Sequence, residues 1–422
     1  MAAPVLARRL ATGLLVLLLA SGGCRRPDGR VVVRFWHAMG GESQKALKTL
    51  VERFEREHPA IRIELVGMGN YDALAQKLMG AVAAKEPPTI AQMYENWTTQ
   101  LLAGGQLVYL DSFVSAPEGL SEQDLLDIFP ALLENNSWNG RLLTLPFNKS
   151  VPVYYYNVPM YESAGYEEFP ASWPEFREAA KRLTKRDAAG NPRVWGAAGG
   201  TDIWIFGSML FQKGGRFLGR EDGPAEFNRP SGVEALKFQV EMVLEDRVQN
   251  TDVGRTPMDD FLVGGIACLT GSSTWRAPVV ERETFLVGMA PVPTWDRPAA
   301  IIYGTNIGMF RSARPAEQAA AWQFIRWFIS PEQQVEWSLA TWYLPVRRSC
   351  LDDARIVERL ERTPGLRDAL AQVDHAVFEP RGLKWLAGRK ALVEELEQAM
   401  LGAKSPQQAL DDAAARYEGR AR

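Results

Sequence analysis

A few carboxylates and one hydroxyl-rich turn are the groups of this chain best suited to bind or transform a small molecule. Glu95 directly follows a segment predicted to be a strand, and open α/β sheets bind their ligands at such strand ends. A carboxylate there can accept two hydrogen bonds from neighbouring hydroxyls, unless it is only a solvated loop acid. Ser272 lies in the polar run 271–274, whose hydroxyls and backbone amides either hold an anion or simply cap a helix.

The chain lacks the patterns of the common metal and enzyme sites. It has three histidines and no His-x-x-x-His or Cys-x-x-Cys pair, so we predict no metal site and no cofactor. It has no G-x-S-x-G, Walker A or strand-linked G-x-G-x-x-G motif. One enzymatic alternative stays open, in which Glu95 pairs with Asp259 or Asp260 in a secreted carbohydrate hydrolase or lyase. Against it, these two aspartates are typical of surface acids at a helix start.

Residues 1–23 predict an export signal. Two arginines precede an apolar run over residues 10–20, which is about half the length needed to cross a bilayer. Small residues and then Cys24 follow, an order that resembles the bacterial lipobox, although Ser21 stands where that motif has a leucine-like residue. We therefore expect a lipidated Cys24, a tether over residues 24–30 and anchoring on the periplasmic or outer cell-surface side. Simple cleavage and secretion is the alternative.

Composition places the exported part of the chain among globular proteins. The sequence has 422 residues, 46% of them hydrophobic, which suits two domains of ordinary size. The formal charge of −3 becomes slightly more negative without the leader, and this argues against a nucleic-acid partner. Cys268 and Cys350 are expected to be buried free thiols, although a single bridge between them stays open.

Periodicity predicts an α/β domain at the start of the exported chain. Residues 31–36 and 61–66 have β-rich or alternating patterns, and a further strand is expected over 89–94. The segments 42–57 and 72–84 between these strands carry apolar residues at helical spacing. Strands and helices that alternate in this order favour a largely parallel sheet.

A second block begins near Pro152 and again mixes strands with helices. Strands are expected over 153–156 and 266–270, and a capping-box sequence at Ser172 opens a helix that runs to Leu183. Further helices are expected from residue 230 and over 316–329, 331–340 and 389–420, the last with a break near Ser405.

Six segments occur in a characteristic order along the chain. They are FWHAMGG (35–41), GNYDALAQKL (69–78), QMYENWT (92–98), LPFNKSVPVYYYN (145–157), SPEQQVEWSLATWYLP (330–345) and KSPQQALDDA (404–413). Their order and spacing resemble the family 1 extracellular solute-binding proteins of bacterial ABC importers, and in particular the glycerol-3-phosphate and sugar receptors. The resemblance covers essentially the whole exported chain.

The resemblance implies an α/β fold of the type II periplasmic-binding-protein kind, with the ligand in a cleft between two hinged lobes. Residues 31–147 plus 299–342 would form lobe one, and 148–298 plus 343–422 lobe two. It implies a non-enzymatic, monomeric receptor that closes around a sugar, a polyol or a polyol phosphate such as glycerol-3-phosphate. It further implies delivery to the transmembrane subunits of an ABC permease; presentation to a sensor kinase is an alternative that sequence barely separates.

The resemblance also implies particular ligand contacts. Trp204 matches one of two aromatic platforms in the glycerol-phosphate receptors, and a flat indole suits the apolar C–H face of a sugar. Thr201 stands where those receptors have the second tryptophan, which reshapes the pocket. Arg381 is the expected partner of a phosphate, with Lys384 as a rival. The expected contacts are Tyr71, Glu95, Ser150, Trp204, Ser272, Gly304, Tyr343 and Arg381.

Several of these residues also have purely structural interpretations. Trp204 would serve equally as a core residue, and Ser150 as a hydroxyl that caps the hinge. Lys149, in the PFNKS segment, either adds positive potential to the cleft or points to solvent. His37, in the FWHAM segment, is interpreted as a packed residue at a strand end rather than as a ligand group.

Overall fold

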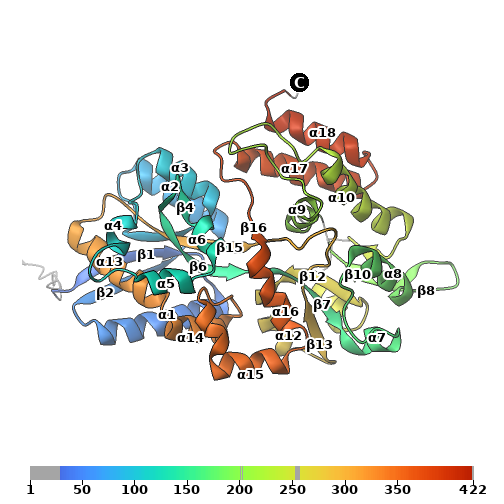
Figure 1. Cartoon of the computed structure of the whole chain (residues 1–422), viewed down its shortest axis with the longest axis horizontal. Coiled ribbons are helices and arrows are strands. Elements are labelled where there is room, and N and C mark those ends of the chain that lie inside the picture. The colour runs from blue at the N-terminus through green and yellow to red at the C-terminus, as the bar shows by residue number, and fades with distance from the viewer. Residues whose placement is uncertain (1–28, 200, 202, 252–256, 421–422) are drawn as a thin grey trace, which may run out of the picture.

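The computed structural model describes residues 29–199, 201, 203–251 and 257–420. Within them the chain forms two five-stranded sheets flanked by helices, which Figure 1 shows as two lobes side by side. The predicted export signal and Cys24 lie outside the described residues. No helix of the described part is long and apolar enough to cross a bilayer.

The first sheet has the strand order β2-β1-β3-β15-β6. β1 pairs in parallel with β2 and β3, as the alternation of strands and helices predicted. β15 instead runs antiparallel to β3 and β6, so the sheet is mixed rather than largely parallel. β6 leaves for the second lobe and β15 returns from it, so no strand–helix–strand crossover enforces parallel pairing there. The elements are β1 (Val31–His37), α1 (Gly41–Glu57), β2 (Ile61–Gly67), α2 (Tyr71–Ala83), β3 (Ile90–Met93), α3 (Glu95–Ala103), β6 (Thr144–Ser150) and β15 (Tyr303–Met309).

Helices from distant parts of the sequence complete the core of the first lobe. The apolar side of α1 packs on α14, and α13 packs on β1. Phe35 lies at its centre, with ring centroids 5.5 Å from Phe147 and 6.0 Å from Phe324. The remaining elements here are α4 (Asp111–Val114), α5 (Glu122–Asp127), α6 (Pro130–Asn135), β4 (Ser137–Trp138), β5 (Arg141–Leu142), α13 (Pro315–Phe328) and α14 (Pro331–Thr341).

The second sheet has the strand order β11-β10-β12-β7-β13 and is also mixed. The predicted capping box is present, because Ser172 accepts the Glu175 backbone N–H and the Glu175 carboxylate accepts the Ser172 N–H. The elements are β7 (Pro152–Asn157), α7 (Val158–Ser163), α8 (Trp173–Leu183), β8 (Lys185–Arg186), β9 (Pro192–Val194), β10 (Ala197–Ala198), α9 (Ile203–Gln212), α10 (Pro230–Val240), β11 (Gln249–Asn250), α11 (Pro257–Leu262), β12 (Cys268–Ser272), α12 (Arg276–Val280) and β13 (Val287–Ala290).

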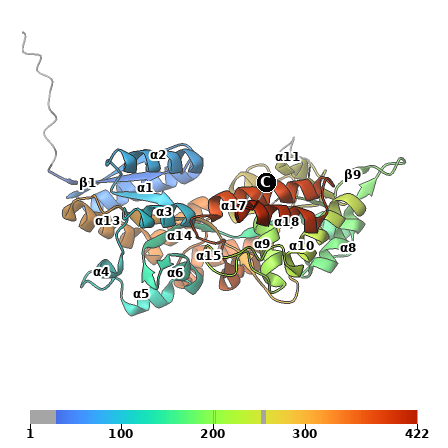
Figure 2. The ribbon, with the colours of Figure 1, turned by 90° about the horizontal axis from the view of Figure 1, so that it is seen from above.

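The last two helices of the chain, α17 and α18, lie against helix α10 of the second lobe. Figure 2 shows α17 and α18 side by side, and both pack on α10. The predicted break near Ser405 is confirmed, whereas the first helix begins at Trp385, earlier than predicted. The helices are α15 (Ala354–Arg362), α16 (Leu366–Ala371), α17 (Trp385–Met400) and α18 (Pro406–Tyr417).

Three stretches of chain connect the lobes. The first passes from β6 to β7 through Val151, and the second from β14 (Ala300–Ile301) to β15 through Ile302. The third follows α14, where the Leu344 N–H donates to the Lys149 carbonyl at 2.7 Å. The three stretches lie next to one another, because β15 also pairs with β6 between Tyr303 and Ser150.

The two cysteines and His37 are core residues, as predicted. Cys268 and Cys350 are buried and unbridged, and burial raises the pKa of each thiol to about 12. The His37 ring is buried, and its Nδ1 accepts the Met39 N–H at 3.1 Å. Burial lowers the pKa of His37 to about 4, so the ring is neutral at pH 7.

Candidate ligand-binding site

Two adjoining cavities, of about 450 and 610 Å³, lie where the two lobes face each other. All the predicted contacts except Arg381 line one cavity or both. Glu95 lines the first cavity, whereas Ser150, Ser272 and Tyr343 line the second. The residues that line both are Tyr71, Tyr94, Trp204, Tyr303, Gly304 and Arg389.

Helix starts in the first lobe place two of these residues. Tyr71 opens α2 after Asn70, whose side chain caps the helix by accepting the Ala73 N–H. The Tyr71 hydroxyl accepts a hydrogen bond from the Asn148 amide at 3.1 Å, which fixes the phenol at the cleft. Glu95 opens α3 directly after β3, at the strand end where the sequence predicted a ligand crevice.

An aromatic and cationic wall comes from the second lobe and the returning strand. Trp204, on α9, lies with its ring centroid 4.3 Å from that of Tyr303. The Arg389 guanidinium lies 5.1 Å from the Trp204 ring centroid. The Nε of Arg389 donates to the Glu379 carboxylate at 2.8 Å, which orients the guanidinium, and its Nη groups make no hydrogen bond to another described residue.

Hydroxyl groups from both sheets meet at the second cavity. The Ser272 hydroxyl donates to the Ser150 hydroxyl at 3.0 Å, although the two residues end strands of different sheets. Ser272 Oγ lies 2.9 Å from Thr274 Oγ1 and accepts the Thr274 N–H. Because hydroxyls both donate and accept, this cluster can bind the oxygens of a phosphate or of a polyol.

The stretches that connect the lobes contribute Gly304 and Tyr343. Gly304 has φ of +100°, and a Cβ there would stand 1.7 Å from the Asn148 carbonyl oxygen, so only glycine fits this approach. The Tyr343 ring stacks on Trp337 with centroids 5.7 Å apart. Burial, reinforced by Tyr71, raises the pKa of Tyr343, so its hydroxyl stays protonated.

Lys149 does not point to solvent, which was one of its two sequence interpretations, and it is not among the described residues that line the two cavities. Its side chain is fully buried behind Glu95, with Nζ 3.4 Å from the carboxylate. Burial lowers the pKa of Lys149, and the charge of Glu95 opposes that shift. The ammonium also donates to Asn135 Oδ1 at 2.8 Å and to the Gly304 carbonyl at 3.4 Å.

The structure places Arg381 apart from the other predicted contacts. Its guanidinium donates to the carbonyls of Glu134 and Ser137 in the first lobe, and its backbone N–H donates to Glu221 in the second. Lys384 does not line the cavities either. Among the described residues, the cationic side chain that lines the cavities is Arg389, which sequence reasoning had treated only as the beginning of a helix.

Other cavity residues were also absent from the sequence predictions. Tyr94 and Tyr303 each precede a predicted contact by one residue, and this adjacency in sequence could have identified them as candidates. Asn135 ends the short helix α6, for which the sequence offered no pattern. Thr201 lines the second cavity, where its small side chain occupies the position that the resemblance assigns to a second indole.

The carboxylates of the enzymatic alternative do not converge. Asp259 forms an ion pair with Arg282, and neither Asp259 nor Asp260 lines the two cavities. Within the described residues no group of histidine, cysteine or acidic side chains is arranged to hold a metal ion.

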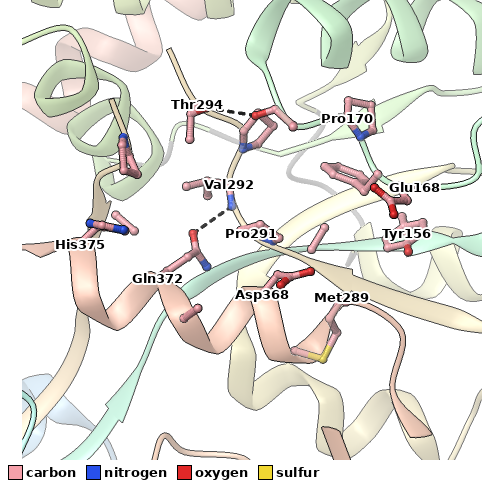
Figure 3. Close-up of a pocket in the computed structure, with 18 of the residues that line it drawn as sticks. Tyr156, Glu168, Pro170, Met289, Pro291, Val292, Thr294, Asp368, Gln372 and His375 are labelled. Carbon is pink, nitrogen blue, oxygen red and sulfur yellow. Dashed lines mark hydrogen bonds between the residues drawn. The ribbon is translucent and has the colours of Figure 1, made fainter. Parts of the chain in front are cut away.

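A further cavity, of about 670 Å³, lies elsewhere in the molecule. Figure 3 shows it between the segments around Glu168, Val292 and Gln372, with Gln372 accepting the Val292 N–H at 3.0 Å. Although this cavity is larger than either of the other two, none of the predicted contact residues and no residue of the first sheet lines it. The two cavities at Trp204 are the better candidate, because both lobes contribute their walls.

Two mixed α/β lobes, with a cleft lined by aromatic faces, hydroxyls and the Arg389 guanidinium, define a two-lobed solute receptor. The sequence profile of a family described as bacterial extracellular solute-binding protein matches residues 49–364. The chain therefore belongs to this family of non-enzymatic receptors.

Known proteins similar to this chain support the same assignment. The sn-glycerol-3-phosphate-binding periplasmic protein UgpB of Escherichia coli K12 is 30% identical, over 91% of each chain. UgpB of Pectobacterium atrosepticum is 28% identical, over 97% of this chain and 94% of its own. The cyclic alpha-maltosyl-1,6-maltose binding protein of Arthrobacter globiformis superposes with a TM-score of 0.80, at 26% identity over 93% of this chain and 99% of its own. UgpB of Mycobacterium tuberculosis matches the fold with a TM-score of 0.80, at 24% identity over 93% and 98% of the two chains.

Proposed function

We propose that this protein is the substrate-binding lipoprotein of an ABC importer, and that it captures a polyol phosphate of the glycerol-3-phosphate type. The observation that carries the proposal is the convergence of Arg389 with the Ser150 and Ser272 hydroxyls around the second cavity. A guanidinium whose Nη groups have no hydrogen-bond partner among the described residues suits a phosphate, and hydroxyls can bind its remaining oxygens. Trp204 offers an apolar surface for the carbon chain. The glycerol-3-phosphate specificity of the relatives with 28–30% identity supports the same ligand class.

Capture would occur by hinge closure. We propose that residues 31–147 plus 299–342 move as one lobe and 148–298 plus 343–422 as the other, around the three connecting stretches. Closure would bring Tyr71 and Glu95 from one lobe against Trp204 and Arg389 from the other. The closed form, anchored by lipid on Cys24, would then dock as a monomer on the permease.

A neutral sugar is the second candidate ligand. Thr201 lines the second cavity in place of an indole, which leaves room for a bulkier molecule. The Arthrobacter oligosaccharide receptor, at 26% identity, supports this ligand class. Glu95 would then accept hydrogen bonds from vicinal hydroxyls, and Arg389 would bind hydroxyls rather than a phosphate.

A thermal-shift screen with sugars, polyols and polyol phosphates tests the proposal. A ligand at 100 times its Kd adds about 2.7 kcal/mol to the free energy of unfolding. We expect sn-glycerol-3-phosphate to stabilise the protein more than glycerol does, with an advantage that shrinks at high salt. Stabilisation by sugars alone would mean that the ligand is a sugar rather than a polyol phosphate. Stabilisation by neither class would overturn both candidate ligands.

A further inference from the structure

A buried polar network lies directly behind Glu95. The Lys149 ammonium has three donors, and three oxygens surround it, from Asn135, Glu95 and Gly304. Asn306 joins the same network, because its Nδ2 donates to Glu95 Oε1 at 3.4 Å and to Asn135 Oδ1 at 3.3 Å. The three segments that carry Glu95, Asn135 and Gly304 are thus held together by one buried cation.

The network fixes which way the Asn135 amide faces. Its Oδ1 accepts from both the ammonium and Asn306, so a flipped amide would set an NH₂ group against two donors. Asn135 is 1% exposed and lines the first cavity. Its Nδ2 is buried and has no hydrogen-bond partner among the described residues. A buried donor without a hydrogen-bond partner is destabilising, and a ligand in the cavity that Asn135 lines would supply that partner.

We propose that Asn135 is a further ligand-binding residue that donates a hydrogen bond to a ligand hydroxyl beside Glu95, and that Lys149 is its positioning residue. The proposal rests on the proposed function of the same cleft. Lys149 and Asn306 both contact Oε1 of Glu95, and Oε2 accepts no hydrogen bond from another described residue. A single hydroxyl can donate to the Glu95 carboxylate and accept from the Asn135 amide.

This pairing would make the first cavity selective for a hydroxyl. A ligand that lacks the hydroxyl would leave the buried Asn135 donor without a partner and remove one hydrogen bond from the Glu95 carboxylate. A group that only donates would satisfy Glu95 but not Asn135. Sites built in this way reject analogues without the matching group strongly. Lys149 would act without touching the ligand, by holding the acceptor side of the Asn135 amide.

Calorimetric titration with sn-glycerol-3-phosphate and its two monodeoxy analogues tests the proposal. We expect wild type to bind one analogue at least about 10-fold more weakly than the parent, which is the effect of one hydrogen bond to a charged site. Asn135→Asp keeps the acceptor for Lys149 and removes the donor, and Asn135→Ala removes both. In these variants and in Lys149→Met, the ratio of the Kd of that analogue to the Kd of the parent compound should fall towards 1.

Asn136→Ala is the matched control. This neighbour is also buried, but its amide donates to the Leu132 carbonyl and accepts from Thr144, and it does not line the cavities. It should keep the wild-type ratio despite a similar loss of packing. An unchanged ratio in folded Asn135 variants would overturn the assignment of Asn135 while leaving the proposed function intact. Failure of wild type to bind any of the three probes would count against both.

Discussion

Replacing Arg389 with glutamine should weaken binding of a phosphate-bearing ligand about 30-fold, with little effect on a neutral polyol. A hydrogen bond to a charged group contributes roughly 1.5–3 kcal/mol. The Arg389 side chain is 29% exposed and already paired with Glu379, so solvent and that carboxylate reduce the net effect. About 2 kcal/mol remains, and at 1.4 kcal/mol per tenfold this is a change in Kd of about 30-fold.

The measurement is calorimetric titration of wild type and variant with sn-glycerol-3-phosphate and with glycerol, at two salt concentrations. Arg381→Gln is the control, because Arg381 contacts both lobes but does not line the cavities. We expect that variant to change the affinities for the two ligands by the same factor. If Arg381→Gln removed the phosphate preference and Arg389→Gln did not, our assignment of the cationic residue would be refuted.

Three other predictions address the platform, the anchor and the pH dependence. Trp204→Ala should weaken binding by about 1–3 kcal/mol through lost stacking while the protein stays folded, as calorimetry and circular dichroism will show; normal affinity would place Trp204 outside the binding surface. Cys24→Ser should move the protein from the membrane fraction to the soluble exported fraction, and unchanged retention would exclude a lipid anchor at this position. The buried His37 has a pKa of about 4 in the folded state and 6.5 in the unfolded state. Its contribution to the free energy of unfolding is therefore fully present above pH 6.5 and is lost as pH falls towards 4. Urea unfolding at pH 7 and pH 5 should therefore show a drop in stability that His37→Gln reduces, and an equal drop in both proteins would contradict the assignment.

Local sequence signals determined most of the secondary structure. The capping box at Ser172, the helical spacing within 42–57 and the break near Ser405 each depend on a few neighbouring residues, and each is present in the structure. The first three strands and their helices could be predicted in order for the same reason. The direction of β15 could not, because it depends on how the chain returns from the other lobe.

The sequence also determined the neighbourhood of the cleft. Tyr71 and Glu95 begin helices directly after strands or turns, and that placement alone puts them at one edge of a sheet. Resemblance to the solute-binding proteins then supplied Trp204, Ser272 and their companions, and the structure gathers these around two adjoining cavities.

Only the tertiary structure decided which charged groups line the two cavities. Arg381 and Arg389 are both cationic and eight positions apart, and the path of the chain into α17 and the packing of that helix on α18 and α10 turn Arg389 towards the cavities. The sequence left open whether Lys149 adds charge to the cleft or points to solvent, and the structure shows it enclosed by Glu95, Asn135 and Gly304 from three separate segments. Local propensity is set by neighbours in sequence, whereas the burial and pairing of a charge depend on residues brought together across the fold, so the elements could be predicted and the electrostatics of the cleft could not.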